Sequence, residues 1–234
     1  MPAAVAGATQ DYLSRILRPG QSPHRSARDA ASLVILDDSG PEARVLMGRR
    51  GSGHVFLPGV LVFPGGRVEP RDYRVRPRRD LPGWMVDKLA TRCDRRDPRG
   101  FARALAAAAL REACEETGFR LPGCDPAGRG ADLRQLTFIA RALTPAKRPR
   151  RFDTRFFCLR FRGVAAPVLR AGDGELEDVN WYALEALARQ ELHVVSRAVI
   201  ETLIERLNAG RLRDPDAPVP FLFARGSSFQ RDIL

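Results

Sequence analysis

The stretch Leu110–Phe119 constrains this chain more than any other, because it places three carboxylates at helical spacing. Glu115 and Glu116 follow Glu112 by three and four residues, so a helix brings all three to one face. Gly118 comes two residues later and favours the left-handed conformation that ends a helix. Three negative charges then crowd the negative end of the helix dipole, which costs about 0.3–1 kcal/mol for each exposed charge. A divalent cation removes this cost; a solvated acidic face is the alternative.

The helix that carries these carboxylates is predicted to begin at Pro98 and to run to Thr117. Asp97 is a good N-cap, and proline suits the first helical position. Strands are predicted at 31–37, 43–49, 61–63, 136–143, 155–161 and 179–182, and further helices at 82–92, 183–189 and 196–207. Strands mixed with few substantial helices predict the α/β (α+β) class, with a mixed central sheet covered on both faces by helices.

The chain is long enough for one well-buried domain with additions. Residues 1–29 are expected to form a loosely ordered arm, and residues 30–210 to form the domain. Within it, about 73–97 are dominated by Arg, Asp and Pro, which indicates an insertion outside the core. Residues 211–234 are expected to form a C-terminal tail that packs on the domain, with an added strand at Phe221–Phe223.

The formal charge of the chain is +11, and almost all of the basicity comes from arginine. Such a charge attracts polyanions, either nucleic acid or a phosphorylated small molecule, although a general arginine bias explains it equally well. The chain has no arginine-rich tail and no basic motif interleaved with aromatic residues, which argues against nucleic acid. Arginine binds phosphate in a bidentate way, so a small phosphorylated ligand is favoured.

Two further features bear on the compartment. No apolar run approaches the length that spans a bilayer, so no membrane association is expected. The four cysteines show no Cys-x-x-Cys spacing, and they are therefore expected to be reduced thiols in a cytoplasmic protein: Cys93, Cys114, Cys124 and Cys158.

Gly65-Gly66, Asp72 and the run Arg111–Gly118 resemble the Nudix box. That box consists of Gly, five residues, Glu, seven residues, and then Arg-Glu-aliphatic-x-Glu-Glu-x-Gly-aliphatic. Here Asp72 stands where the family has glutamate, and 38 residues separate it from Arg111. The resemblance implies a Nudix-type α/β/α sandwich with a mixed central sheet and a helical insertion inside the box.

An interrupted box resembles that of the coenzyme A diphosphatases of the Nudix motif 19 type. The stretches Val45–Arg50, Phe63–Gly66 and Arg150–Thr154 also resemble this subgroup, whereas Val55 stands where a broader coenzyme A signature expects arginine. The resemblance implies metal-dependent cleavage of coenzyme A or acyl-coenzyme A to 3′,5′-ADP and (acyl-)phosphopantetheine. The alternatives are a Nudix diphosphatase for ADP-ribose, NADH or another nucleoside diphosphate derivative, and a non-catalytic Nudix regulator that binds a nucleotide.

The resemblance also implies roles for the residues of the box. The implied catalytic residues, which also bind Mg²⁺ or Mn²⁺, are Glu112, Glu115 and Glu116, with a backbone carbonyl from Gly65. Arg111 is implied to orient the helix by pairing with Asp72. The general base is a box glutamate or a later one, for which Glu175 and Glu177 are the candidates.

A coenzyme A substrate carries a 3′-phosphate that needs a cationic site. The candidates are Arg49, Arg50, Arg150 and Arg151, of which Arg151 is preferred. Trp84 and Met85 of the insertion are candidates for a wall around the pantetheine arm or for a dimer contact. The expected partner is therefore a small nucleoside diphosphate derivative, and a homodimer is compatible with the sequence.

Overall fold

The computed structural model describes residues 26–51, 59–119, 121, 131–146, 148, 150–161, 176–190, 192–225 and 228–234. In chain order the elements are β1 (Arg28–Asp37), β2 (Arg44–Arg50), β3 (Leu61–Val62), β4 (Gly65–Arg67), η1 (Asp72–Arg74), α2 (Gly83–Ala90), α3 (Pro98–Thr117), η2 (Leu133–Gln135), β5 (Leu136–Leu143), β6 (Phe152–Arg160), β7 (Leu176–Ala183), α4 (Leu184–Arg189), α5 (Val194–Asn208), β8 (Pro220–Arg225) and β9 (Ser228–Ile233).

The described strands form one mixed sheet in the order β3-β2-β1-β6-β5-β8-β9. β4 pairs with β1, and β7 pairs with β2. The β1–β6 and β5–β8 pairs are parallel, while β1 and β2 form an antiparallel hairpin with Leu36 opposite Val45. The predicted α+β class with a mixed sheet is confirmed.

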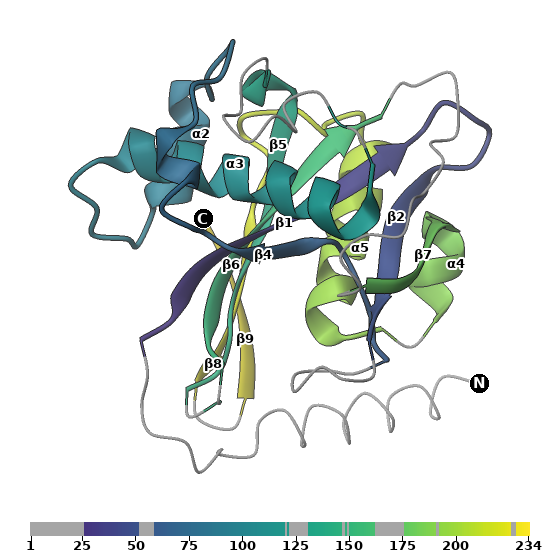
Figure 1. Cartoon of the computed structure of the whole chain (residues 1–234). Coiled ribbons are helices and arrows are strands. Elements are labelled where there is room, and N and C mark those ends of the chain that lie inside the picture. Colours follow the sequence, from purple (N-terminus) through teal and green to yellow (C-terminus); the bar gives the residue numbers. More distant parts are fainter. Residues whose placement is uncertain are drawn as a thin grey trace.

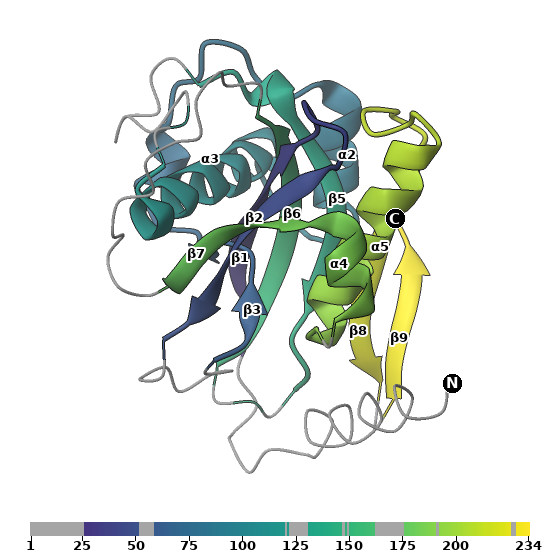
Figure 2. The same cartoon turned by 90° about the vertical axis from the view of Figure 1, so that its right-hand side faces the viewer.

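Helices cover both faces of this sheet, as the two views in Figure 1 and Figure 2 show. Leu33 and Ile35 of β1 belong to the core under α2 and α3, whereas Val34 and Leu36 belong to the core under α4 and α5. A strand buried on both faces needs a continuous apolar run instead of an alternating one. This explains why the sequence of β1 shows no polar alternation.

The helix α3 has the bounds that the sequence predicts, because its start and stop signals are local. The side chain of Asp97 accepts a hydrogen bond of 2.9 Å from the backbone N–H of Gly100, and Pro98 stands in the first turn. At the other end Gly118 has a φ of 65°, the left-handed conformation expected of it. Many of its buried residues are alanines, which allow a close approach to the sheet.

The insertion between the two halves of the box is part of the core, which corrects the expectation from its composition. Leu81, Met85, Val86 and Leu89 are buried in the same cluster as the apolar face of α3. Met85 is therefore unavailable as a wall for a ligand or as a dimer contact, and Trp84 packs against the same cluster. The helical spacing of these residues in α2 outweighs the many charged residues around them.

Both ends of the described chain add strand residues to the sheet. β1 begins at Arg28, three residues before the predicted start, while most of the expected N-terminal arm lies outside the described residues. The predicted strand at Phe221–Phe223 is confirmed as part of β8. β9, which was not predicted, pairs with β8 along its whole length.

The cysteines correct one expectation. Cys93 and Cys158 are free, but Cys114 is disulfide-bonded. The cytoplasmic location thereby loses the support of four reduced thiols and stays a prediction. Among the described helices, none has the length and apolar character that a membrane crossing requires.

Candidate functional site

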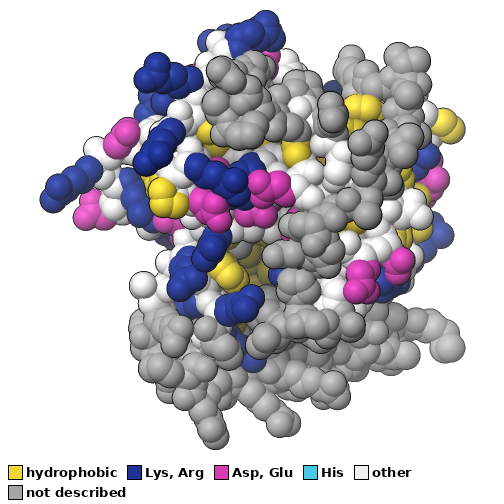
Figure 3. All heavy atoms as spheres, in the orientation of Figure 1, with side chains coloured by type: hydrophobic (Ala, Val, Ile, Leu, Met, Phe, Trp, Pro, Cys, Tyr) yellow, Lys and Arg dark blue, Asp and Glu magenta, His cyan; other side chains and the backbone are white. Residues whose placement is uncertain are grey.

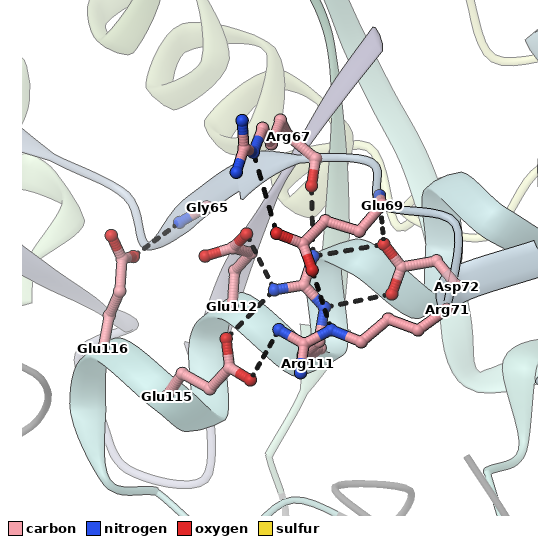
Figure 4. A network of polar contacts seen from close by, with 9 residues as sticks. All are labelled: Gly65, Arg67, Glu69, Arg71, Asp72, Arg111, Glu112, Glu115 and Glu116. Carbon is pink, nitrogen blue, oxygen red and sulfur yellow. Dashed lines mark hydrogen bonds and ion pairs between the residues drawn. The ribbon is translucent and has the colours of Figure 1, made fainter. Parts of the chain in front are cut away.

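The last two turns of α3 bring Glu112 and Glu116 against β4, while Glu115 faces Arg111 and Arg71 (Figure 4). Glu116 is only 3% exposed, and its Oε2 accepts a hydrogen bond of 2.7 Å from the backbone N–H of Gly65. At Gly66 an added Cβ would lie 2.3 Å from Oε1 of Glu112. Gly66 therefore allows the backbone of β4 to lie directly against Glu112, whereas a side chain at Gly65 would meet Ser32 of β1.

Arg111 joins the two halves of the split box. Its Nε and Nη2 donate to the two oxygens of Asp72 at 3.0 and 3.1 Å, so the pair implied by the resemblance is present and bidentate. Its Nη1 donates to Glu112 at 2.8 Å and to Glu115 at 3.0 Å. Burial opposes the charge of Arg111, but Asp72 and Glu112 outweigh it and raise its pKa above the ordinary value.

The aspartate at position 72 reaches Arg111 although it is one carbon shorter than the glutamate of the family. Asp72 opens the short helix η1, which packs against α3. Its Oδ2 also accepts a hydrogen bond of 2.7 Å from the backbone N–H of Glu69. The turn between β4 and η1 therefore holds this carboxylate in place for Arg111.

Two members of the site, Glu69 and Arg71, were missed by the sequence reasoning. Nη2 of Arg71 lies 3.2 Å from Oε1 of Glu115, and its Nε lies 2.8 Å from Oε2 of Glu69. Nε of Arg67 is 3.6 Å from the other oxygen of Glu69. The alternating charges at 67, 69 and 71, directly after Gly66, are the sequence signal that could have revealed these pairs.

The charge of this network suits a divalent cation. With every group ionised, three arginines and five carboxylates leave a formal charge of −2: Arg67, Arg71, Arg111, Glu69, Asp72, Glu112, Glu115 and Glu116. Carboxylate oxygens are also the ligands that Mg²⁺ prefers. In the described part of the chain, however, no three His, Cys, Asp or Glu side chains are already grouped to hold a metal. Arg111 contacts Glu112 and Glu115, so metal binding requires these carboxylates to change partners.

The predicted phosphate-binding arginines lie at one end of the sheet. Arg49 and Arg50 end β2, and Arg151 directly precedes β6. Because β1 runs antiparallel to β2 and parallel to β6, the last residues of β2 and the first residues of β6 lie at the same end of the strands. β4 pairs with the beginning of β1, so Gly65 and Gly66 lie toward this end of the strands as well.

The contacts of these three arginines differ from one another. Nη1 of Arg49 donates to the carbonyl of Gly59 at 3.3 Å, and Nε of Arg151 donates to that of Thr144 at 3.1 Å. Nε of Arg50 is buried and has no hydrogen-bond partner within the described ranges.

The candidate bases are placed less clearly. Glu175 lies outside the described residues. Glu177 is an exposed residue of β7 that stands opposite Arg49 of β2, next to an irregularity in the pairing where Asp178 has a φ of 49°. Among the described residues, neither a hydrogen bond nor an ion pair joins Glu177 to α3. Its role as a base stays a prediction.

Comparisons with known proteins point to one domain family. Residues 91–203 match the family model of the NUDIX domain, a range that begins inside the insertion and contains the second half of the box. The crystal structure of a NUDIX hydrolase from Alicyclobacillus acidocaldarius is 26% identical, with a TM-score of 0.59, and the match covers 80% of this chain and 93% of that one.

Two other solved structures are less similar. The NUDIX domain of Shewanella oneidensis NrtR, complexed with ADP ribose, is 17% identical with a TM-score of 0.48, and the match covers 78% of this chain and 90% of that one. The MutT protein from Methanosarcina mazei Go1 is 18% identical with a TM-score of 0.48, covering 80% and 97%. No curated protein matches the chain.

Proposed function

We propose that this chain, which contains a Nudix domain and is a hydrolase acting on pyrophosphate bonds, requires Mg²⁺ or Mn²⁺ and cleaves coenzyme A or acyl-coenzyme A. The products are 3′,5′-ADP and phosphopantetheine or its acyl derivative. Nudix hydrolases generally need divalent metal ions, which supports the proposed metal requirement. The substrate is the part of the proposal that goes beyond it.

The observation that carries the proposal is the pairing of Arg111 with Asp72 across the insertion. This pair orients the end of α3, so that Glu112 and Glu116 lie against the glycines of β4. In the proposed mechanism these carboxylates and Glu115 hold the metal, with a backbone carbonyl from Gly65. A bound metal supplies charge neutralisation of the diphosphate and activation of a water. Arg111 positions the ligands and does not touch the substrate.

The support for a coenzyme A substrate comes from the split box and from the arginines at one end of the strands. Arg49, Arg50 and Arg151 lie toward the end of the sheet where β4 meets α3, and their guanidinium groups suit phosphate oxygens. We assign to them the phosphates of the substrate, with Arg151 as the first candidate for the 3′-phosphate. Glu177 is proposed as the general base if none of the box glutamates takes that role.

A substrate panel tests the proposal directly. The purified protein is incubated at alkaline pH with Mg²⁺ or Mn²⁺ and with coenzyme A, acyl-coenzyme A, ADP-ribose or NADH, and the products are separated by chromatography. The expected result is 3′,5′-ADP from the two coenzyme A substrates, lost on chelation of the metal. Cleavage of ADP-ribose with coenzyme A left intact would refute the substrate, and turnover that survives chelation would refute the metal requirement.

A further inference from the structure

Glu115 is held between two arginines that come from different parts of the chain (Figure 4). Nη1 of Arg111 lies 3.0 Å from its Oε2, and Nη2 of Arg71 lies 3.2 Å from its Oε1. Both oxygens of this carboxylate are therefore engaged by guanidinium groups. A cation that binds either oxygen has to displace an arginine or to share the oxygen with it.

The two arginines differ in how easily they can leave. The side chain of Arg111 is 13% exposed and is fixed by the bidentate pair with Asp72 and by a hydrogen bond to the carbonyl of Arg67. The side chain of Arg71 is 48% exposed and follows the turn after β4. Its Nε stays within 2.8 Å of Glu69, so Arg71 keeps one ion-pair partner when it leaves Glu115.

We propose that Arg71 competes with the divalent cation for Glu115 and thereby lowers the metal affinity of the site. The inference rests on the proposed function, because it takes Glu115 as a metal ligand. Without metal, Arg71 neutralises a glutamate that lies near two others at the negative end of α3. With metal, the same guanidinium turns back to Glu69. Arg71 thus acts as an exchangeable counter-ion of the site.

The size of the effect follows from the exposure of the pair. Exposed ion pairs are weak, and the loss of the Arg71–Glu115 pair together with one nearby positive charge corresponds to about a two- to fivefold change in metal affinity. The difference is expected to shrink as the salt concentration rises, because exposed charges are screened over about 10 Å at 0.1 M salt.

The test is a calorimetric titration of the substrate-free protein with Mn²⁺. Wild type is compared with Arg71→Gln and with the matched control Arg67→Gln, which removes the same charge four residues earlier. The control suits this purpose because Arg67 pairs with Glu69 and its side chain has no ion pair with the α3 carboxylates among the described residues. The expected result is a Kd for Mn²⁺ about two- to fivefold lower in Arg71→Gln, with a clearly smaller change in Arg67→Gln.

Each other outcome has a definite meaning. Equal Kd values in wild type and both variants would refute the competition while leaving the metal site intact. Weaker binding by Arg71→Gln would show instead that Arg71 positions Glu115 for the metal, which also overturns the proposal. If wild type binds no Mn²⁺ at all, the proposed function itself fails. Circular dichroism spectra of the three proteins confirm that they have the same fold.

Discussion

Two networks of arginines and carboxylates in this molecule have similar chemistry and opposite accessibility. The first surrounds Arg111 at the end of α3, where Glu115 and Arg71 are partly exposed and where basic and acidic side chains gather on the surface (Figure 3). The second lies at the first residues of β1 and β6. There Arg141 of β5 pairs with both oxygens of Asp153 of β6 at 2.8 and 2.7 Å. Exposed pairs can exchange partners with ligands at little cost, whereas buried pairs cannot.

The buried network anchors the far end of the insertion. Arg155 is fully buried, and its Nη1 donates to Asp29 at 3.1 Å while its Nη2 contacts the sulfur of Cys93 at 2.9 Å. Arg95 pairs with the other oxygen of Asp29 at 2.6 Å. The insertion is therefore held at both ends, by Asp72 next to α3 and by these residues beneath the sheet. The exposure of Glu115 and Arg71 separates the network that can bind a ligand from the purely structural one.

The largest expected effect is the loss of stability in Arg155→Ala. The change removes a fully buried guanidinium and its ion pairs with Asp29 and Asp153, which keep Arg95 and Arg141 as partners. A loss of about 3–5 kcal/mol is expected. Urea denaturation measures the free energy of unfolding, and Arg71→Ala is the matched control with an expected loss below about 1 kcal/mol. Equal losses in the two variants would erase the distinction between the networks.

Truncation of a core residue of the insertion comes next. Leu89→Ala removes a fully buried side chain that belongs to the core under α3, so a loss of about 2–5 kcal/mol is expected. The same denaturation experiment measures it. A change of less than 1 kcal/mol would show that the insertion is an appendage, as its composition indicated.

At the end of α3, Glu116→Gln is expected to change activity instead of stability. The amide can still accept the hydrogen bond of the Gly65 N–H, so the melting temperature stays within a few degrees of wild type. The loss of a negatively charged ligand is expected to lower kcat by at least about 10²–10³-fold. Full turnover by this variant would remove Glu116 from the proposed mechanism.

The smallest expected effect is the loss of stability in acid that comes from His193, a residue that belongs to neither network. Burial lowers the pKa of His193, the N-cap of α5, to about 4 from 6.5. The unfolded chain therefore binds a proton at higher pH than the folded one, and stability falls as the pH drops from 6.5 through 4. The expected loss from His193 is about 1–2 kcal/mol between pH 8 and pH 5.

Stability curves at several pH values check this prediction. His193→Asn keeps a side-chain acceptor at the N-cap and removes the titration. The variant should lose less stability than wild type over the same pH range. A parallel decline of the two proteins would assign the acid response to other groups.

The sequence predicted most of the fold wherever the signals are local. The bounds of α3 follow from Asp97, Pro98 and Gly118, and β5 follows from a compact apolar run. β4 and β9 were not predicted, because such short or polar strands exist only through their partners. The burial of α2 was also missed, since charged residues around Met85 and Leu89 obscured their helical spacing.

What the sequence by itself determined is the helix with three carboxylates on one face, because caps and periodicity act within a few residues. The tertiary structure alone decided which cations reach those carboxylates. Asp72 meets Arg111 across 38 intervening residues, and Arg71 reaches Glu115, because β4 lies directly against α3. Such contacts depend on the path of a distant strand, which Gly65 and Gly66 permit and no local pattern specifies.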